Sequence, residues 1–229
     1  KEIETITKEK GVFFHTDAVA AVGNILVDVE EAHIDALSMS ANQFYGPSGI
    51  GALYVREGVR ILPFMEGGIQ EGGRRAGTEN IIGIVGMGKA AELAKSEMAQ
   101  RIDKIQNLRN QLRDGILKNI NHVYLNGHQT NRLPGNLSLC IEYIEGESVL
   151  LFLDMQGIAI SSGSACTSRS LKASHVIMAT CVDAALAQGT VLFSLGIDNS
   201  ETDVKYVLEK LPPIVERLRQ MSPLYNQKK

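Results

Sequence analysis

VFFHTDA, residues 12–18, carries the clearest indication of architecture in this chain. An apolar run of strand length, residues 12–15, follows a charged helical segment, residues 1–10, which Gly11 ends in the manner of a C-cap glycine. A helix that leads directly into a buried strand is typical of a βαβ unit, so the sequence predicts an α/β fold. Because the chain enters this unit halfway, we expect the strands that would precede it to be absent.

Asp17 lies directly after this run, at the carboxyl end of the predicted strand. In open α/β sheets that edge is where ligands bind. The alternative role for Asp17 is to cap the short helix that follows. A second predicted strand, residues 34–40, also ends in polar side chains, Ser40, Asn42 and Gln43.

A glycine-rich segment, residues 67–78, contains two adjacent arginines, Arg74 and Arg75. It lacks the GxxxxGK[ST] pattern, which excludes a P-loop. Its arginines suit an anion, and the alternative is an exposed flexible loop.

The periodicity of residues 80–120 predicts one long helix that joins two domains. We expect residues 1–100 to belong to a larger α/β domain and residues 101–229 to form a small α+β domain. The remaining predicted strands are residues 51–55, 123–125, 136–143, 158–160 and 190–194. Further helices are predicted at residues 148–155, 171–180, 202–210 and 214–221, with Pro212 and Pro213 breaking the chain between the last two.

Cys166 lies in a loop of small residues, SSGSACTS, residues 161–168. A cysteine on a flexible polar loop is a candidate nucleophile, provided that its thiol pKa is lowered, and the alternative is a plain loop residue. Cys140, by contrast, lies in an apolar run and is expected to serve packing.

Composition narrows the class of protein. The 229 residues are 44% hydrophobic and carry a net charge of −3, which gives no reason to expect nucleic acid or an anionic membrane as a partner. Three unevenly spaced cysteines form neither a disulfide framework nor a zinc motif, so a reducing, cytoplasmic setting is expected. No apolar run reaches the ~20 residues of a membrane span, and the first residues are too charged for a signal peptide.

Several motifs, in order along nearly the whole chain, resemble the C-terminal half of group I (NifS/IscS-type) cysteine desulfurases, which are class V aminotransferases. These motifs are HTDA, YGPSGIGALYVR, RRAGTENIIGIVGMGKAAELA, YLNG, EGES, SSGSACTS, FSLG and LRQMSPLY. The resemblance implies the pyridoxal 5′-phosphate (PLP)-dependent fold type I, with the second half of its large domain followed by its small domain. It also implies a homodimer and an iron–sulfur scaffold protein as partner, with residues 222–225 as the docking element; a frayed C-terminus is the alternative.

The resemblance also assigns roles to single residues. Asp17 matches the aspartate that pairs with the pyridinium nitrogen, and Ser40 matches a phosphate-binding hydroxyl. Thr78 matches a residue that reaches the phosphate held by the partner subunit. Cys166 matches the cysteine that takes sulfur from the substrate as a persulfide, and it can also ligate a cluster held by a scaffold. No resident metal site is expected.

Positions that would touch cofactor or substrate depart from the family pattern. Gln43 stands where the PLP-binding lysine belongs, and a carboxamide cannot form an imine, so covalent attachment of PLP is not expected. Asn42 replaces a phosphate-binding histidine, and Leu192 replaces the arginine that holds the substrate carboxylate. Ala20 and Gln188 replace a glutamine and a histidine.

Three hypotheses follow. In the first, the protein is a desulfurase relative without autonomous PLP catalysis that keeps Cys166 and its dimer and scaffold surfaces. In the second, a separate N-terminal polypeptide completes an active cysteine desulfurase. In the third, the chain is a non-functional truncated paralogue. The retained SSGSACTS loop favours the first hypothesis over the third.

Overall fold

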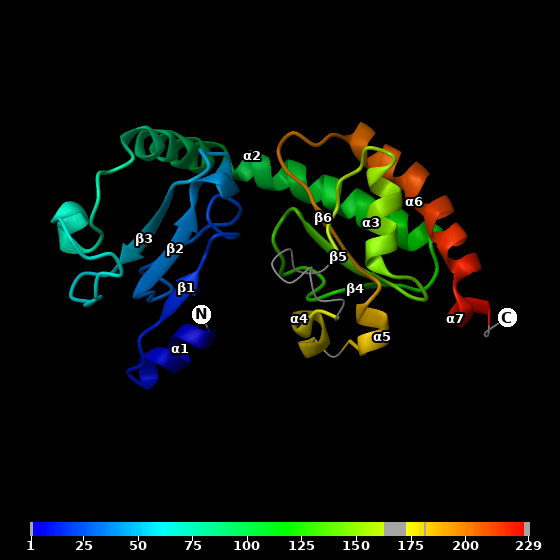
Figure 1. The fold of residues 1–229 in the computed structure, drawn as a ribbon, viewed down its shortest axis with the longest axis horizontal. Coiled ribbons are helices and arrows are strands. Elements are labelled where there is room, and N and C mark those ends of the chain that lie inside the picture. Colours follow the sequence, from blue (N-terminus) through cyan, green and yellow to red (C-terminus); the bar gives the residue numbers. More distant parts are fainter. Residues whose placement is uncertain (1, 163–172, 181, 227–229) are drawn as a thin grey trace. The chain divides into compact units, whose positions relative to one another are not determined.

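A computed structural model describes residues 2–162, 173–180 and 182–226. The chain forms two compact units, Lys1–Gln100 (unit 1) and Arg101–Lys229 (unit 2), and each is described by itself (Figure 1).

Unit 1 is built on a three-stranded sheet in the order β1-β2-β3. Strand β1 (His15–Asp17) runs parallel to β2 (Ala36–Ser40), and β3 (Gly51–Val55) is antiparallel to β2. The register pairs Asp17 with Ser38 and Ser40 with Gly51. The carboxyl ends of β1 and β2 therefore meet at one edge of the sheet.

The two faces of this sheet differ because alternate residues of a strand point to opposite sides. Leu37 is buried on one face, where Met39 and Tyr54 pack near it. The segment that connects β1 to β2 contributes Ala18 and Ile34 to the same core. The other face carries the side chains that alternate with these and is polar along β1 and β2.

Helix α1 (Glu2–Glu9) precedes the sheet, and Gly11 follows it with φ +60°, the left-handed conformation of a C-cap glycine. The 3-10 helices η1 (Ala41–Phe44) and η2 (Gln70–Gly73) lie in the connections after β2 and β3. Phe44 anchors η1 by packing in a small core with Ala90 and Ala94, which lie on the long helix α2 (Ile81–Asn119).

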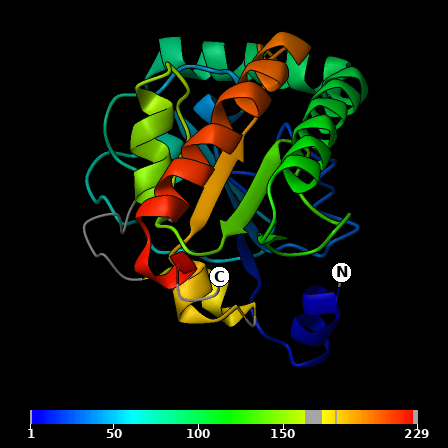
Figure 2. The same ribbon diagram turned by 90° about the vertical axis from the view of Figure 1, so that its right-hand side faces the viewer.

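Unit 2 contains an antiparallel sheet in the order β4-β5-β6. Its strands are β4 (Val123–Leu125), β5 (Asn136–Ile141) and β6 (Thr190–Ser194). The C-terminal half of α2, together with α3 (Gly146–Asp154) and α6 (Glu201–Met221), packs on one face, as Figure 2 shows. The fully buried side chains of this core come from all of these elements: Ile116, Leu137, Leu139, Ile141, Val149, Leu153, Val191, Leu211 and Val215. Short helices α4 (His175–Ala179), α5 (Ala184–Ala187) and α7 (Pro223–Asn226) complete the unit.

Four predicted strands are wrong in detail. Strand β2 begins at Ala36 and not at residue 34, and β5 ends at Ile141 and not at residue 143. The first strand begins at His15 and not at residue 12, and Val12 and Phe13 are 55% and 52% exposed, because no second layer within the described residues covers them. Residues 158–160 form no strand. Of the described residues in this segment, Ser161 alone pairs with β6, and its N–H and C=O both bond to Leu192.

The prediction that Pro212 and Pro213 break the last helix is also wrong. Helix α6 runs through both prolines to Met221. The two missing N–H groups remove two helical hydrogen bonds, but Leu211 and Val215 on either side are buried in the core of unit 2. Burial of this face holds the helix together across the prolines.

Within the described residues, none of the helices has the length and apolar character needed to cross a bilayer.

Candidate functional site

The polar face of the unit 1 sheet gathers four of its hydrogen-bonding side chains. His15 and Asp17 lie two residues apart on β1, and Ser38 and Ser40 lie two residues apart on β2. Because Asp17 pairs directly with Ser38, all four side chains point to the same side. We name this set the β1–β2 polar face. It lies on a rigid sheet and ends at the carboxyl edge, where ligands of open α/β sheets bind.

Asp17 is exposed, and one of its carboxylate oxygens has a local role like the capping role that the sequence offered as the alternative. Its Oδ1 accepts a hydrogen bond from the N–H of Val19 at 2.9 Å, which shapes the turn after β1. Its second carboxylate oxygen makes no hydrogen bond to any described residue. Asp17 therefore combines a turn with an acceptor that remains available to a cationic or N–H-bearing ligand.

His15 and Ser38 form a pair that the sequence analysis did not identify. The Nε2 of His15 lies 2.8 Å from the Oγ of Ser38, which is the residue opposite Asp17. The sequence could have indicated that His15 shares a face with Asp17, because alternation along a strand places residues 15 and 17 on the same side. What sequence did not reveal is the register between β1 and β2.

Ser40, Asn42 and Gln43 lie where β2 ends and η1 begins. Ser40 donates a hydrogen bond from Oγ to Asn42 Oδ1 at 2.6 Å, and Asn42 and Gln43 are exposed on η1. A left-handed Tyr45, with φ 68°, ends η1. The structure thus brings Ser40, Asn42 and Gln43 together at the same sheet edge as Asp17.

The remaining predicted residues are not brought to this edge by any contact in the described part of the chain. Thr78 is exposed in the connection between η2 and α2. Leu192 belongs to unit 2, where it pairs with Ser161 at the start of the small-residue loop. Cys166 lies outside the described residues. Cys140, predicted to pack, is fully buried, and its Sγ lies 3.1 Å from Asn126 Oδ1.

The chemistry available at this edge is that of a carboxylate, two hydroxyls, an imidazole and two carboxamides. Such groups can bind a cationic heteroaromatic nitrogen and an anionic oxygen through hydrogen bonds. They include no amine, and the sequence contains no lysine between Lys10 and Lys89. The described residues also contain no group of three or more His, Cys, Asp or Glu that could hold a metal ion.

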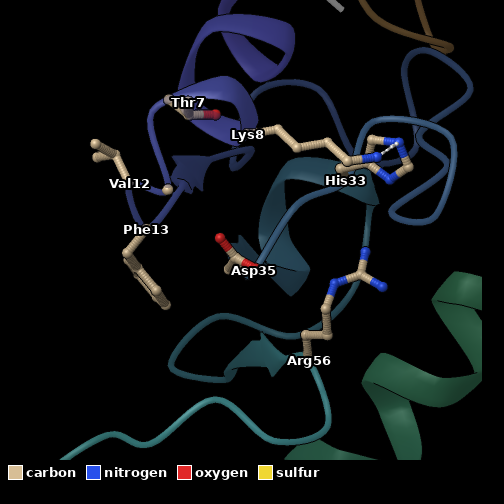
Figure 3. Close-up of a pocket in the computed structure, with 8 residues that line it drawn as sticks. Thr7, Lys8, Val12, Phe13, His33, Asp35 and Arg56 are labelled. Carbon is tan, nitrogen blue, oxygen red and sulfur yellow. Dashed lines mark hydrogen bonds between the residues drawn. The ribbon is translucent and has the colours of Figure 1, made fainter.

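A hollow of about 530 Å³ lies at the other end of β1 and β2. It is lined by Lys8, Phe13, His33, Asp35 and Arg56 among others (Figure 3). Its charged groups are already bonded. Lys8 Nζ lies 3.0 Å from His33 Nε2, and Asp35 Oδ2 accepts the N–H of Phe14 at 2.8 Å.

Arg56 in this hollow donates to Glu30 Oε2 at 2.6 Å, and this hydrogen bond raises the pKa of Arg56. The β1–β2 polar face, which keeps a free carboxylate oxygen, is therefore the better candidate site.

Comparison with known proteins shows which family the chain resembles. A family model described as aminotransferase class-V matches residues 1–207. A protein named cysteine desulfurase IscS from Dictyoglomus turgidum is 49% identical over 223 residues, covering 97% of this chain and 57% of the relative. A protein of the same name from Methanosarcina thermophila is 51% identical over 224 residues, covering 98% of this chain and 55% of the relative.

Among solved structures, a NifS-like protein from Rickettsia africae superposes with a TM-score of 0.86 at 28% identity, over 94% of this chain and 57% of that chain. The mixed α/β architecture is accordingly that of fold type I. The chain spans a little over half the length of these relatives.

Proposed function

This chain belongs to the class V aminotransferase family, and we propose that it is a cysteine desulfurase-like protein. In this proposal it acts in the cytoplasm, where it mobilises sulfur for iron–sulfur clusters. It has no PLP catalysis of its own. It keeps Cys166 as a persulfide carrier, together with surfaces for a second copy of itself and for a scaffold protein. Its similarity to proteins named cysteine desulfurase supports the general assignment. The assignment of unit 1 to the large domain and unit 2 to the small domain is part of this proposal.

The single observation that carries the loss of catalysis is Gln43. It is exposed on η1, directly after the strand that ends in Ser40, at the position where the family resemblance expects the cofactor lysine. A carboxamide nitrogen is not nucleophilic and cannot attach PLP covalently. Leu192 adds a second loss, because an aliphatic side chain cannot pair with a substrate carboxylate.

The residues present fit PLP without covalent attachment. The free carboxylate oxygen of Asp17 suits the pyridinium nitrogen, and Ser40 and Asn42 suit the phosphate, joined by Thr78 of the partner subunit. When bound, PLP would supply an electron sink for an amino acid substrate. In this chain the role of Asp17 is to hold the ring nitrogen protonated by pairing with it.

Cys166 can work without the cofactor. Its thiolate attacks the outer sulfur of a persulfide on a donor thiol, the donor's S–S bond breaks, and the donor leaves as a thiolate. A new S–S bond then holds one sulfur on Cys166, with no net change in oxidation state. A thiolate on the scaffold then attacks the outer sulfur held on Cys166. The S–S bond to Cys166 breaks, and Cys166 leaves as a thiolate.

An exposed apolar surface in unit 1 supports the proposal of a homodimer. The large apolar side chains of residues 62–85 are unusually exposed, and Phe64 and Leu62 are almost entirely so. The surface comprises Leu62, Phe64, Met65, Ile69, Ile81, Ile82, Ile84 and Val85, and we name it the 62–85 apolar surface. Monomers rarely expose large apolar patches, and a contact between two copies would bury exposed apolar side chains of this kind. Thr78, which the resemblance places against the partner's phosphate, lies within the same stretch.

The alternative is that a separate N-terminal polypeptide completes an active desulfurase. One observation favours it. Val12 and Phe13 are exposed beside strand β1, whose second edge pairs with no described strand. A partner that added a strand there would cover both side chains.

Spectroscopy and intact-mass analysis distinguish these functions. We expect the protein purified with PLP to carry no adduct at residue 43 after borohydride treatment. We also expect that incubation with a persulfide donor adds the mass of one sulfur atom to the wild type but not to Cys166→Ser.

Other outcomes would contradict the proposal. A yellow protein with a co-purifying N-terminal half establishes the split enzyme instead. Failure of Cys166 to accept sulfur, with no PLP bound, establishes a non-functional copy.

A further inference from the structure

Unit 2 contains three neighbouring arginines that share a single ion pair to a carboxylate among the described residues. Arg109 and Arg113 lie one turn apart on one face of α2, and Arg132 lies in the connection between β4 and β5. Arg109 Nη1 points to the carbonyl oxygen of Leu133, the neighbour of Arg132, at 3.4 Å. The three guanidinium groups therefore meet where α2 packs against this connection. We name them the arginine cluster.

The cluster is buried to an unusual degree for three cations. Arg109 is only 2% exposed, and its remaining hydrogen bond goes from Nε to the neutral Asn110 Oδ1 at 3.0 Å. Within the described residues, the one ion pair of the cluster joins Arg113 Nε to Asp114 Oδ1 at 2.7 Å. Buried cations are ordinarily paired, because the loss of hydration is otherwise uncompensated.

Arg132 shows the deficit most directly. Its Nη2 donates to the carbonyl oxygen of Asn126 at 2.5 Å, but its Nε and Nη1 are buried and have no hydrogen-bond partner among the described residues. Buried donors of this kind are rare in native proteins and indicate a missing partner. Arg113, whose side chain is 23% exposed, also leaves its two terminal nitrogens without a bond to any described residue.

Mutual repulsion accompanies this burial. Desolvation lowers the pKa of Arg109 and of Arg132, and the charge of Arg113 lowers both further. Arg109 also lowers the pKa of Arg132. The negative charge of a bound anion would oppose the lowering of these pKa values, because it favours the protonated guanidinium.

We propose that the arginine cluster is a binding site for a small oxyanion of the phosphate or sulfate class. The anion enters beside the partly exposed Arg113 and accepts hydrogen bonds from its terminal nitrogens. Rotation of the partly buried Arg132 side chain brings its unpartnered Nε and Nη1 to the same anion. Guanidinium forks suit such oxyanions because two parallel N–H groups match two oxygens. This site lies in unit 2 and is independent of the function proposed above for the β1–β2 polar face and Cys166.

The test is a titration of the full chain with sodium phosphate, and in a second series with sodium sulfate, at constant ionic strength maintained with sodium chloride. Thermal unfolding and isothermal calorimetry give the apparent affinity. Arg113→Gln removes accessible donors that bond to no other described residue. Arg217→Gln is the matched control, because it removes an exposed arginine of the same unit that lies over the Phe152 ring at 5.3 Å.

We expect saturable stabilisation of the wild type and of Arg217→Gln, and an apparent affinity at least about tenfold weaker in Arg113→Gln, as loss of a charge-assisted fork implies. Arg113→Lys, which keeps the charge but loses the fork, should fall between them. The Nε–H resonance of Arg132 should shift on titration of the wild type. No saturable response in the wild type, or equal responses in Arg113→Gln and Arg217→Gln, would overturn the proposal.

Discussion

Gln43 and Leu192 are single substitutions with consequences far larger than their volume, because each removes the one functional group that its proposed role needs. In the function that we propose, Gln43 stands in place of an amine and Leu192 in place of a cation. Both side chains stand on well-formed elements, η1 and β6, so the backbone around them keeps its shape. The substitutions change chemistry without changing the fold.

The first prediction concerns Gln43→Lys. The exposed position on η1 should allow the new lysine to react with PLP, so that borohydride fixes PLP to residue 43, as peptide mapping would show. Release of sulfide from cysteine should nevertheless stay at the background of the wild type, because Leu192 leaves the substrate carboxylate unpaired. Sulfide release that depends on cysteine would show that Leu192 matters less than we infer.

Arg219 gives a second prediction at the scale of a residue. It is buried, its Nε donates to the carbonyl oxygen of Glu142 at 3.2 Å, and its Nη2 donates to that of Asn121 at 2.8 Å. Arg219→Met removes the hydrogen bonds that the buried guanidinium donates to these carbonyl oxygens, so the free energy of unfolding should fall by about 3 kcal/mol. Urea denaturation measures it. Arg217→Met, an exposed arginine on the same helix, should change it by less than about 1 kcal/mol. Equal effects would mean that burial of Arg219 is not what matters.

At the scale of elements, helix α2 contains a matched pair of glycines. A Cβ at Gly86 would lie 2.5 Å from Cγ of Pro47, whose ring cannot turn away, whereas a Cβ at Gly88 would meet nothing within 4 Å. Gly88→Ala should therefore raise the free energy of unfolding by up to about 1 kcal/mol, and Gly86→Ala should lower it. Parallel urea melts compare the two variants. The same sign for both would show that helix propensity, and not contact with Pro47, dominates.

The prolines of α6 provide a fourth prediction. Pro213 is exposed within a continuous helix, and it supplies no N–H to the helical ladder. Pro213→Ala should raise the midpoint of urea unfolding, with a gain of about 1–3 kcal/mol in the free energy of unfolding. A loss of stability would mean that the rigidity that proline gives to the unfolded chain outweighs the missing hydrogen bond.

At the scale of the whole molecule, the 62–85 apolar surface bears on oligomeric state. If it is the contact between two copies, Phe64→Asp should shift sedimentation from dimer to monomer, because a carboxylate cannot be buried there without a partner. Leu224→Asp on α7 replaces another exposed apolar residue and should leave the dimer intact. A wild-type monomer, or a Phe64→Asp dimer, would assign the surface to another partner.

Sequence alone determined the elements whose signals are local: the long helix of residues 80–120, the strands at residues 51–55, 123–125 and 190–194, and the place of Asp17 at a strand's carboxyl end. It also carries the prediction that PLP does not attach covalently at Gln43, since no fold can turn a carboxamide into an amine. Periodicity does not show what covers an apolar run, so the exposure of Val12 and Phe13 became visible only in the structure.

Only the tertiary structure placed His15 beside Ser38 and gathered the arginine cluster, because both depend on register and packing between segments far apart in sequence. Only burial of Leu211 and Val215 kept α6 intact through two prolines, where local propensity favours a break. Local interactions choose the elements, and the larger free energy of burying their apolar faces decides where they end and which side chains meet.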